Sequence, residues 1–313
     1  MKTFDKLYSE LQDDENSELN DLLKKVQQES KKTWKKVLII CLIVDILILL
    51  VCLNIDTLDL PRGIMILQTI GVMLFVDAII MVILNAIFSG NYGNYRKYVQ
   101  KYKSVVIDKL ISNFYNSAEY FPTKELPRYM YDEGKYEEYY NRYWSEDYIE
   151  AEIDNKYSIQ MGEVLTEDES GDSTSICFTG LFAKVIMHKS MQGELRIMRN
   201  GTFAFSNKLK MDSSEFEKCF DVKASDNIKG MQLLTSDVME ELIEFFNNTR
   251  LKFDIVIRNN ELYLRFHSGR MFEPRSIKCD SLNKEEIQKY FYMLNFTYNL
   301  SKRLISLIEE TEM

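Results

Sequence analysis

The sequence has 313 residues, of which 46% are hydrophobic, so it is long enough for a folded domain with further segments attached. It carries 39 Lys and Arg against 48 Asp and Glu, a formal net charge of −9. The excess of acid lies after residue 103, and an acidic domain is a poor match for the polyanionic backbone of nucleic acids, so we expect no nucleic-acid partner. The five cysteines have no paired spacing, which indicates free thiols in a reducing compartment.

Residues 1–36 are predicted to form an amphipathic lead-in on the cytoplasmic side of a membrane. Phe4, Leu7 and Leu11 share a helix face, and a second apolar stripe begins at Leu19, after the polar break DDENSE. We expect two helices that pack on the main domain or on the bilayer surface.

Residues 37–88 contain two apolar runs, at 37–55 and 64–88, and are predicted to form a transmembrane helical hairpin. As a helix, the nineteen residues of the first run would extend about 28 Å, close to the roughly 30 Å of a hydrocarbon core. The connection between the runs includes the turn-forming stretch DLPRG. The fifteen Val, Ile and Leu of the first run favour membrane insertion by more free energy than burying Asp45 costs, so insertion of this helix is still favoured.

Basic residues flank the outer ends of this hairpin. Six lysines stand between positions 22 and 36 and four Lys or Arg between 89 and 103, whereas the short loop has one Arg and two Asp. By the positive-inside rule we expect a multi-pass protein of the cell membrane with both termini in the cytoplasm and the lipid bilayer as a partner.

Four polar side chains within the apolar runs form what we call the polar seam: Asp45, Gln68, Asp77 and Asn85. Asp45 lies about 12 Å and Asp77 about 16 Å from the cytoplasmic ends of their helices, so both are near the bilayer midplane. One interpretation is that the seam holds helices together, within the chain or between the copies of a homo-oligomer. The alternative is that the aspartates carry protons or ions.

Residues 89–114 keep a helical apolar spacing and are predicted to form a stalk, and residues 115–313 a cytoplasmic domain. Ten of the nineteen tyrosines lie between 115 and 157, among many acids. Tyrosine combines an apolar ring with a polar tip, so this segment suits an acidic helix lying on the domain or a partner-binding surface.

The rest of the domain alternates between strand and helix signals. Two strands are predicted around the DNK turn of YIEAEIDNKYSIQMGEVL, and further strands at 175–189, 193–200 and 202–207. SEFEKCF and DVMEELIEFFNN predict helices, the second capped by Thr235 or Ser236, and LKFDIVIRNNELYLRFHS predicts a hairpin that turns at Asn259-Asn260. With a final helix capped by Asn283, these elements predict an α+β fold with a mostly antiparallel sheet and flanking helices.

Several motifs occur in a characteristic order after the two apolar runs: SEDYIEAEI, FTGLFAKV, SSEFEKCFDVKASD, LTSDVMEELIEF and MFEP. In this order the chain resembles, over nearly its whole length, the bacterial membrane-protein family called domain of unknown function 3137 (DUF3137), and FEKCFDV is the most specific piece. The resemblance implies a two-span protein with a cytoplasmic α+β domain and no established activity. It also suggests a LemA-type membrane protein as a partner.

Motifs of catalytic, cofactor or metal sites are absent from the sequence. The two histidines, His188 and His267, stand in no metal-ligand spacing, and there is no P-loop, GxGxxG or GxSxG. We therefore expect no catalytic residue, no cofactor and no metal, and a protein-interaction or scaffold module at the inner face of the membrane. The alternatives are a membrane-bound enzyme with an unrecognised site and a transport accessory that uses the intramembrane aspartates.

Overall fold

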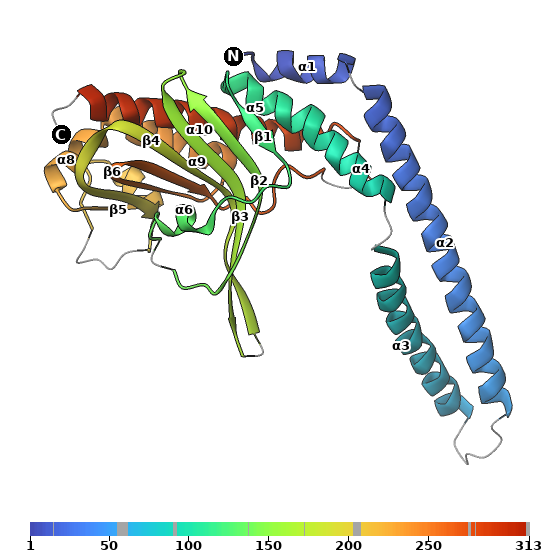
Figure 1. The fold of residues 1–313 in the computed structure, drawn as a ribbon. Helices are drawn as coiled ribbons and strands as arrows, with labels where there is room; N and C mark the ends of the chain where they lie inside the picture. Colours follow the sequence, from blue (N-terminus) through green and yellow to red (C-terminus); the bar gives the residue numbers. More distant parts are fainter. Residues whose placement is uncertain are drawn as a thin grey trace. The chain divides into compact units, whose positions relative to one another are not determined.

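The computed structural model describes residues 1–14, 16–54, 62–89, 93–136, 138–171, 173–202, 208–274, 277–278 and 280–310 (Figure 1). Within the helices, the side chains of 14, 16–17, 51–54, 62–68 and 83–89 lie outside this description. The chain forms two compact units. The sheet unit contains residues 1–14, 103–273 and 282–313, and the helical unit contains residues 15–102 and 274–281. One boundary therefore falls within the predicted stalk, between residues 102 and 103.

The helical unit consists of α2 (Asn16–Asn54), α3 (Arg62–Ser89) and α4 (Gly93–Tyr102). Because its 39 residues include no Gly or Pro, α2 continues without interruption from the predicted lead-in into the first apolar run. Its first half packs on α4, and Lys101 Nζ lies 2.8 Å from Glu18 Oε2.

Among the residues that the structure describes, no helix combines the length and the mean hydropathy of a membrane span.

The sheet unit is built on a six-stranded sheet in the order β1-β2-β3-β4-β5, with β6 also paired to β4 (Figure 1). The strands are β1 (Glu119–Phe121), β2 (Arg142–Ile153), β3 (Tyr157–Ser170), β4 (Ser173–Arg199), β5 (Phe220–Ala224) and β6 (Phe253–Phe266). The helices are α1 (Phe4–Asp14), α5 (Asp108–Phe114), α6 (Arg128–Asp132), α7 (Ser214–Cys219), α8 (Asn227–Leu233), α9 (Ser236–Thr249) and α10 (Lys284–Glu310). The pairings between these strands are antiparallel, which confirms the predicted α+β fold with a mostly antiparallel sheet and flanking helices.

The main core lies between the sheet and α10, which contacts β4 and α5 (Figure 1). The apolar residues of α10 recur at a spacing of three and four, so one stripe of the helix is buried along its whole length. The Phe245 ring of α9 stacks on Phe296 of α10 with 3.7 Å between centroids. Asn283 caps α10 as predicted, because its side-chain oxygen accepts a hydrogen bond from the Glu286 amide at 3.0 Å.

The Tyr-rich segment was expected to form an acidic helix, and this prediction was wrong. Among the described residues of the segment only α6 is helical, and a loop and the long strand β2 follow it. Tyr131 and Tyr136 are buried with Phe182 in a second, smaller core on the face of the sheet opposite α10. Most of the ring surface is thus used for packing, and the phenol of Tyr131 donates a hydrogen bond to Glu138 at 2.5 Å.

Two strands also run through positions at which breaks were predicted. β6 continues through Asn259-Asn260 without a chain reversal. Residues 253–257 and 262–266 are all buried, and both stretches pair with β4. Asn259 has a φ of 54° and serves a bend in the strand instead of a reversal. β4 likewise joins the two strands predicted at 175–189 and 193–200 through an irregular stretch between Ile186 and Glu194. Except for Thr202, the strand predicted at 202–207 lies outside the described residues.

Candidate functional site

Lys103 is a buried cation at the start of the helical segment that leads into α5. It is the first residue of a π-helical turn, Lys103–Ile107, and is only 3% exposed. A π-turn holds one more residue than an α-helical turn and is frequent at functional sites. A buried ammonium group is stable only where anionic or polar partners surround it, so the neighbours of Lys103 define the candidate site.

Asp147 reaches Lys103 from a β-bulge in β2. The register of β2 against β3 shifts between Glu146 and Ile149, and Asp147, with a φ of 58°, is fully buried. Aspartate is one of the few residues besides glycine that adopts this backbone conformation readily. The Asp147 carboxylate accepts a hydrogen bond from Lys103 Nζ at 2.8 Å and another from the Tyr120 hydroxyl.

The loop Arg270–Glu273, which follows β6, supplies the third side of the site. Met271 and Phe272 are fully buried and anchor the loop, and Phe272 has a φ of 58°. The Met271 amide donates a hydrogen bond to Glu163 Oε2 at 2.9 Å, and Glu273 Oε1 lies 2.7 Å from Lys103 Nζ. This loop contains the first three residues of the MFEP motif, so one of the motifs that carry the family resemblance lies at the site.

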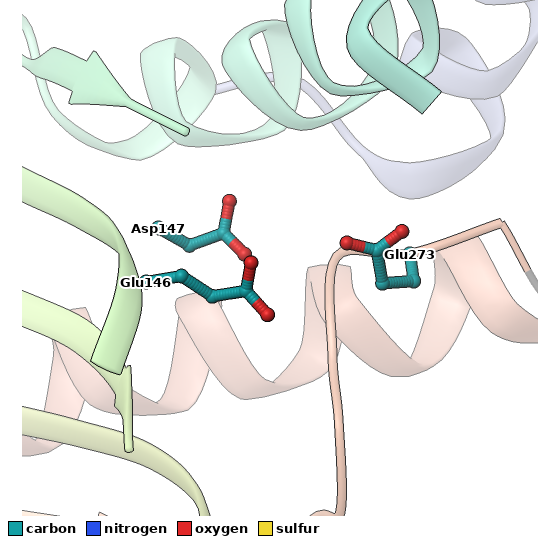
Figure 2. Close-up of side chains that lie close together, drawn as sticks. All are labelled: Glu146, Asp147 and Glu273. Carbon is teal, nitrogen blue, oxygen red and sulfur yellow. The ribbon is translucent and has the colours of Figure 1, made fainter. Parts of the chain in front are cut away.

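We call Lys103, Tyr120, Glu146, Asp147 and Glu273 the lysine cluster. Figure 2 shows the carboxylates of its three acids turned toward one another, and one oxygen of each lies within 4.8 Å of the others. Carboxylates at this spacing are suitable ligands for a divalent cation. Here the Lys103 ammonium lies among them, at 2.7 Å from Glu273, 2.8 Å from Asp147 and 3.8 Å from Glu146. Lys103 supplies the positive charge that the acids require, so the cluster acts as an ionic lock between α5, β2 and the loop.

Burial shifts the titration of the acids at this site. Burial raises the pKa of Asp147 to about 6, and the positive charge of Lys103 limits the rise. Burial alone would lower the pKa of Lys103, but Asp147 and Glu273 raise it. Lys103 and Asp147 are therefore both charged at neutral pH. At Glu163 the hydrogen bond from Met271 and the charge of Arg270 oppose the effect of burial only in part. Burial therefore raises the pKa of Glu163 to about 8, and this carboxyl is mostly protonated at pH 7.

An open hollow of about 590 Å³ adjoins the lysine cluster, where β2 and β3 extend beyond the helices. The pleat places Arg142, Trp144 and Glu146 on one face, opposite Glu167, Leu165 and Glu163 of β3. This face is the continuation of the core face that α10 covers further along the sheet. Trp144 is 45% exposed and Ile176, which is paired with Glu167, is 62% exposed. We call this surface the Trp144 face: Arg142, Trp144, Leu165, Glu167, Ile176 and Arg270.

The polar seam is described in part. Cys41 of α2 is buried, and the Asp45 and Asp77 carboxylates lie close enough to its thiol to act on it electrostatically. One carboxylate oxygen of each aspartate is buried and has no hydrogen-bond partner within the described part of the chain. The side chains of Gln68 and Asn85 lie outside the described residues. Asp45 and Asp77 thus come together between α2 and α3, and their role stays a prediction.

Sequence reasoning missed the lysine cluster and the Trp144 face. Lys103 looked like one more member of the basic segment after the second apolar run, and the acids looked like surface residues. One usable signal was the tandem acids Glu146-Asp147, which interrupt the alternation of a strand pattern and indicate a bulge. Of the two histidines, His267 has a polar partner: its Nε2 lies 3.1 Å from Asp254, which also binds Arg265.

Comparison with known proteins supports the family resemblance. The family model described as "Protein of unknown function (DUF3137)" matches residues 176–305, which confirms the predicted family. No curated protein matches the chain. Among solved structures, the chain is similar to the crystal structure of the mycobacterial trehalose monomycolate transport factor A, TtfA, with 8% sequence identity, a TM-score of 0.31, and coverage of 66% of this chain and 94% of that chain. A TM-score this low carries no argument about function.

Proposed function

Residues 176–305 match the DUF3137 family model, and from this premise we propose that the chain is a membrane-anchored protein-interaction module that binds its partner through the Trp144 face. Members of a family of unknown function supply no activity to transfer. The proposal therefore depends on the geometry and charge of this chain.

The Trp144 face is the observation that carries the proposal. It continues the apolar core face of the sheet, yet Trp144 and Ile176 remain exposed at 45% and 62%. Exposed apolar surfaces with a polar rim are typical of interaction sites, and Trp and Arg are the residues that most often dominate binding energy. Arg142 and Arg270 form part of this rim, paired with Glu169 and Glu146.

Charge indicates which partner the face would accept. Four acids lie on or beside it, and two bases oppose them: Glu146, Glu163, Glu167 and Glu169 against Arg142 and Arg270. Even with Glu163 protonated, the surface keeps an excess of negative charge. The complementary partner is a protein segment that combines apolar with basic side chains.

The lysine cluster supports an interaction role over catalysis. Its groups neutralise and hydrogen-bond one another, and Glu163 is occupied by the Met271 amide. A general base or nucleophile has to be free to meet a substrate, whereas these groups hold the sheet, α5 and the loop together. The cluster thus supplies a rigid support beside the Trp144 face.

Anchoring by the α2–α3 hairpin is the second part of the proposal. Large apolar side chains of α2 and α3 are exposed, including Leu38, Ile39, Leu42, Leu74, Phe75 and Val82 at 57–70%. Such surfaces are unstable in water and are stable in lipid. The predicted span 37–55 ends one residue beyond the described stretch, and in both spans part of the side chains, those of 51–54, 64–68 and 83–88, lie outside the description. The basic residues at the outer ends favour cytoplasmic termini, and hydrogen bonding by the polar seam would hold the two helices together.

Tryptophan fluorescence tests the binding function directly. The chain has two tryptophans, so Trp34→Phe makes Trp144 the sole emitter in the full chain reconstituted in phosphatidylcholine nanodiscs. A peptide of alternating Leu and Lys should shift the emission to the blue and saturate, and a Leu and Glu peptide should not. Ile176→Ser should weaken binding about tenfold, whereas Tyr292→Ser, at an exposed aromatic of α10 away from this face, should not. Equal responses to both peptides, or an unchanged affinity in Ile176→Ser, would contradict the proposal.

A further inference from the structure

A second hollow, of about 710 Å³, lies in the helical unit between α2 and the residues Ile277 and Lys278. Its lining is basic with apolar ends: Gln27, Ser30, Lys31, Trp34, Lys35, Leu38, Ile277 and Lys278. Three ammonium groups and one hydroxyl thus surround one space, and no carboxylate is among these residues. The hollow is suited to an anion.

The hollow is built from two distant parts of the sequence. Lys31, Trp34, Lys35 and Leu38 share one face of α2, because they follow one another at intervals of three and four residues. Lys278 comes from the segment that follows the Arg270–Glu273 loop, and that segment is attached where the Gln27 amide donates a hydrogen bond to the Ile277 carbonyl at 2.7 Å. A basic segment next to a membrane span would attract anionic lipids with the lysines of α2 alone. The addition of Lys278 from a distant part of the sequence indicates a specific site.

The position of the hollow along α2 identifies the source of the anion. The apolar run begins at Val37, so Lys35 lies about 3 Å and Lys31 about 9 Å before it along the helix. The headgroup region of a bilayer occupies roughly 5 to 8 Å on each side of the hydrocarbon core. Trp34 is 54% exposed at the same level, where tryptophan is enriched in membrane proteins.

We propose that this hollow binds the phosphate of an anionic phospholipid headgroup, held by Lys31, Lys35 and Lys278, with Trp34 and Leu38 against the start of the acyl chains. The site rests on the proposed anchoring of α2 in a membrane. Each lysine near an anionic lipid surface contributes about 1 kcal/mol, equivalent to about fivefold in affinity.

Native mass spectrometry of the full chain can test this site. The protein is reconstituted in vesicles of phosphatidylcholine with phosphatidylglycerol, released in mild detergent, and the retained phosphatidylglycerol is counted. Lys278→Gln should lower retention about fivefold, whereas Lys32→Gln should retain the wild-type level, because Lys32 belongs to the same basic stretch of α2 and does not line the hollow. Lys278→Arg keeps the charge and should restore binding, which separates loss of the site from misfolding of the segment.

Two further measurements decide between the remaining explanations. Inorganic phosphate should not displace the lipid at millimolar concentration, and displacement would show that the site takes free phosphate and would overturn the lipid assignment. Carbonate extraction of the vesicles reports insertion independently. A chain that carbonate releases would contradict the anchoring and this site with it. A chain that stays inserted, with equal retention in Lys278→Gln and Lys32→Gln, would overturn the headgroup site alone.

Discussion

At the scale of single residues, the lysine cluster illustrates how buried charges depend on one another. Lys103 is 3% exposed and Asp147 is fully buried, so neither can recover solvation if its partner is lost. Breaking a buried ion pair is costly because it leaves an uncompensated charge, whereas an exposed pair contributes little.

Lys103→Met should therefore destabilise the protein by about 3 to 5 kcal/mol, because Asp147 and Glu273 lose their common cation. Urea unfolding of the full chain, followed by circular dichroism, measures this loss. Lys156→Met is the matched control, since Lys156 pairs with Glu309 on the surface, and it should leave the midpoint unchanged. Asp147→Asn should restore part of the stability in the Lys103→Met background, and similar losses in Lys103→Met and Lys156→Met would contradict an ionic lock.

Glu163 should make stability fall as pH rises. Its folded pKa of about 8 lies above the ordinary 4.5, so the folded state holds a proton that the unfolded state has released, and the cost of ionisation grows between these values. Between pH 6.5 and pH 8 the similar effect of Asp147, with a pKa of about 6, is largely complete. Over that range the free energy of unfolding should decline for the wild type and remain flat for Glu163→Gln. A parallel decline in both proteins would assign the effect to another group.

At the scale of elements, the bend in β6 replaces the hairpin that the sequence predicted. Asn259 has a φ of 54°, which a β-branched residue tolerates poorly. Asn259→Val should cost about 1 to 2 kcal/mol, and Asn259→Gly should cost less. Asn260→Val is the control, because Asn260 is absent from the positive-φ residues of the described chain. If Asn259→Val and Asn260→Val unfold at the same urea concentration, the bend does not depend on the left-handed residue.

The polar seam permits a test of the pairing of α2 with α3. A carboxyl or amide group at position 45 can form hydrogen bonds with α3, and such bonds contribute about 0.6 kcal/mol on average in membranes. Asp45→Asn should preserve crosslinking between Cys41 and a cysteine introduced at Met81, one turn from Asp77, and Asp45→Leu should weaken it. If the aspartates carry protons instead, Asn and Leu should impair cellular function equally, since neither side chain titrates.

Elements with local signals were the easiest to predict. The predicted caps Thr235 and Asn283 each accept a hydrogen bond from an amide three residues ahead, so the information lies within one helical turn. The path of β6 was mispredicted because Asn-Asn is compatible with a turn and with a bend, and only pairing with β4 decides between them. Tertiary contacts overrode the local preference.

At the scale of the whole molecule, the fold class and the family followed from the order of elements and motifs, and the candidate sites did not. Lys103 and Asp147 are 44 residues apart, and Lys278 reaches the hollow on α2 from the far end of the chain. Contacts between residues so far apart in the sequence produce no periodic pattern from which they could be predicted. The tyrosines gave an ambiguous signal, because the same rings suit a small core and a binding surface.

Thiol labelling in intact cells tests most directly whether the module is anchored with its sheet unit on the inner side. A membrane-impermeant reagent should label a cysteine introduced at Thr57, in the loop between the apolar runs, and should leave Cys177 and Cys219 unmodified. Both of these thiols are partly exposed and should react once the membrane is permeabilised, which controls for burial. Labelling of Cys177 or Cys219 in sealed cells, or equal protection of the cysteine at position 57, would contradict the membrane-anchored interaction module.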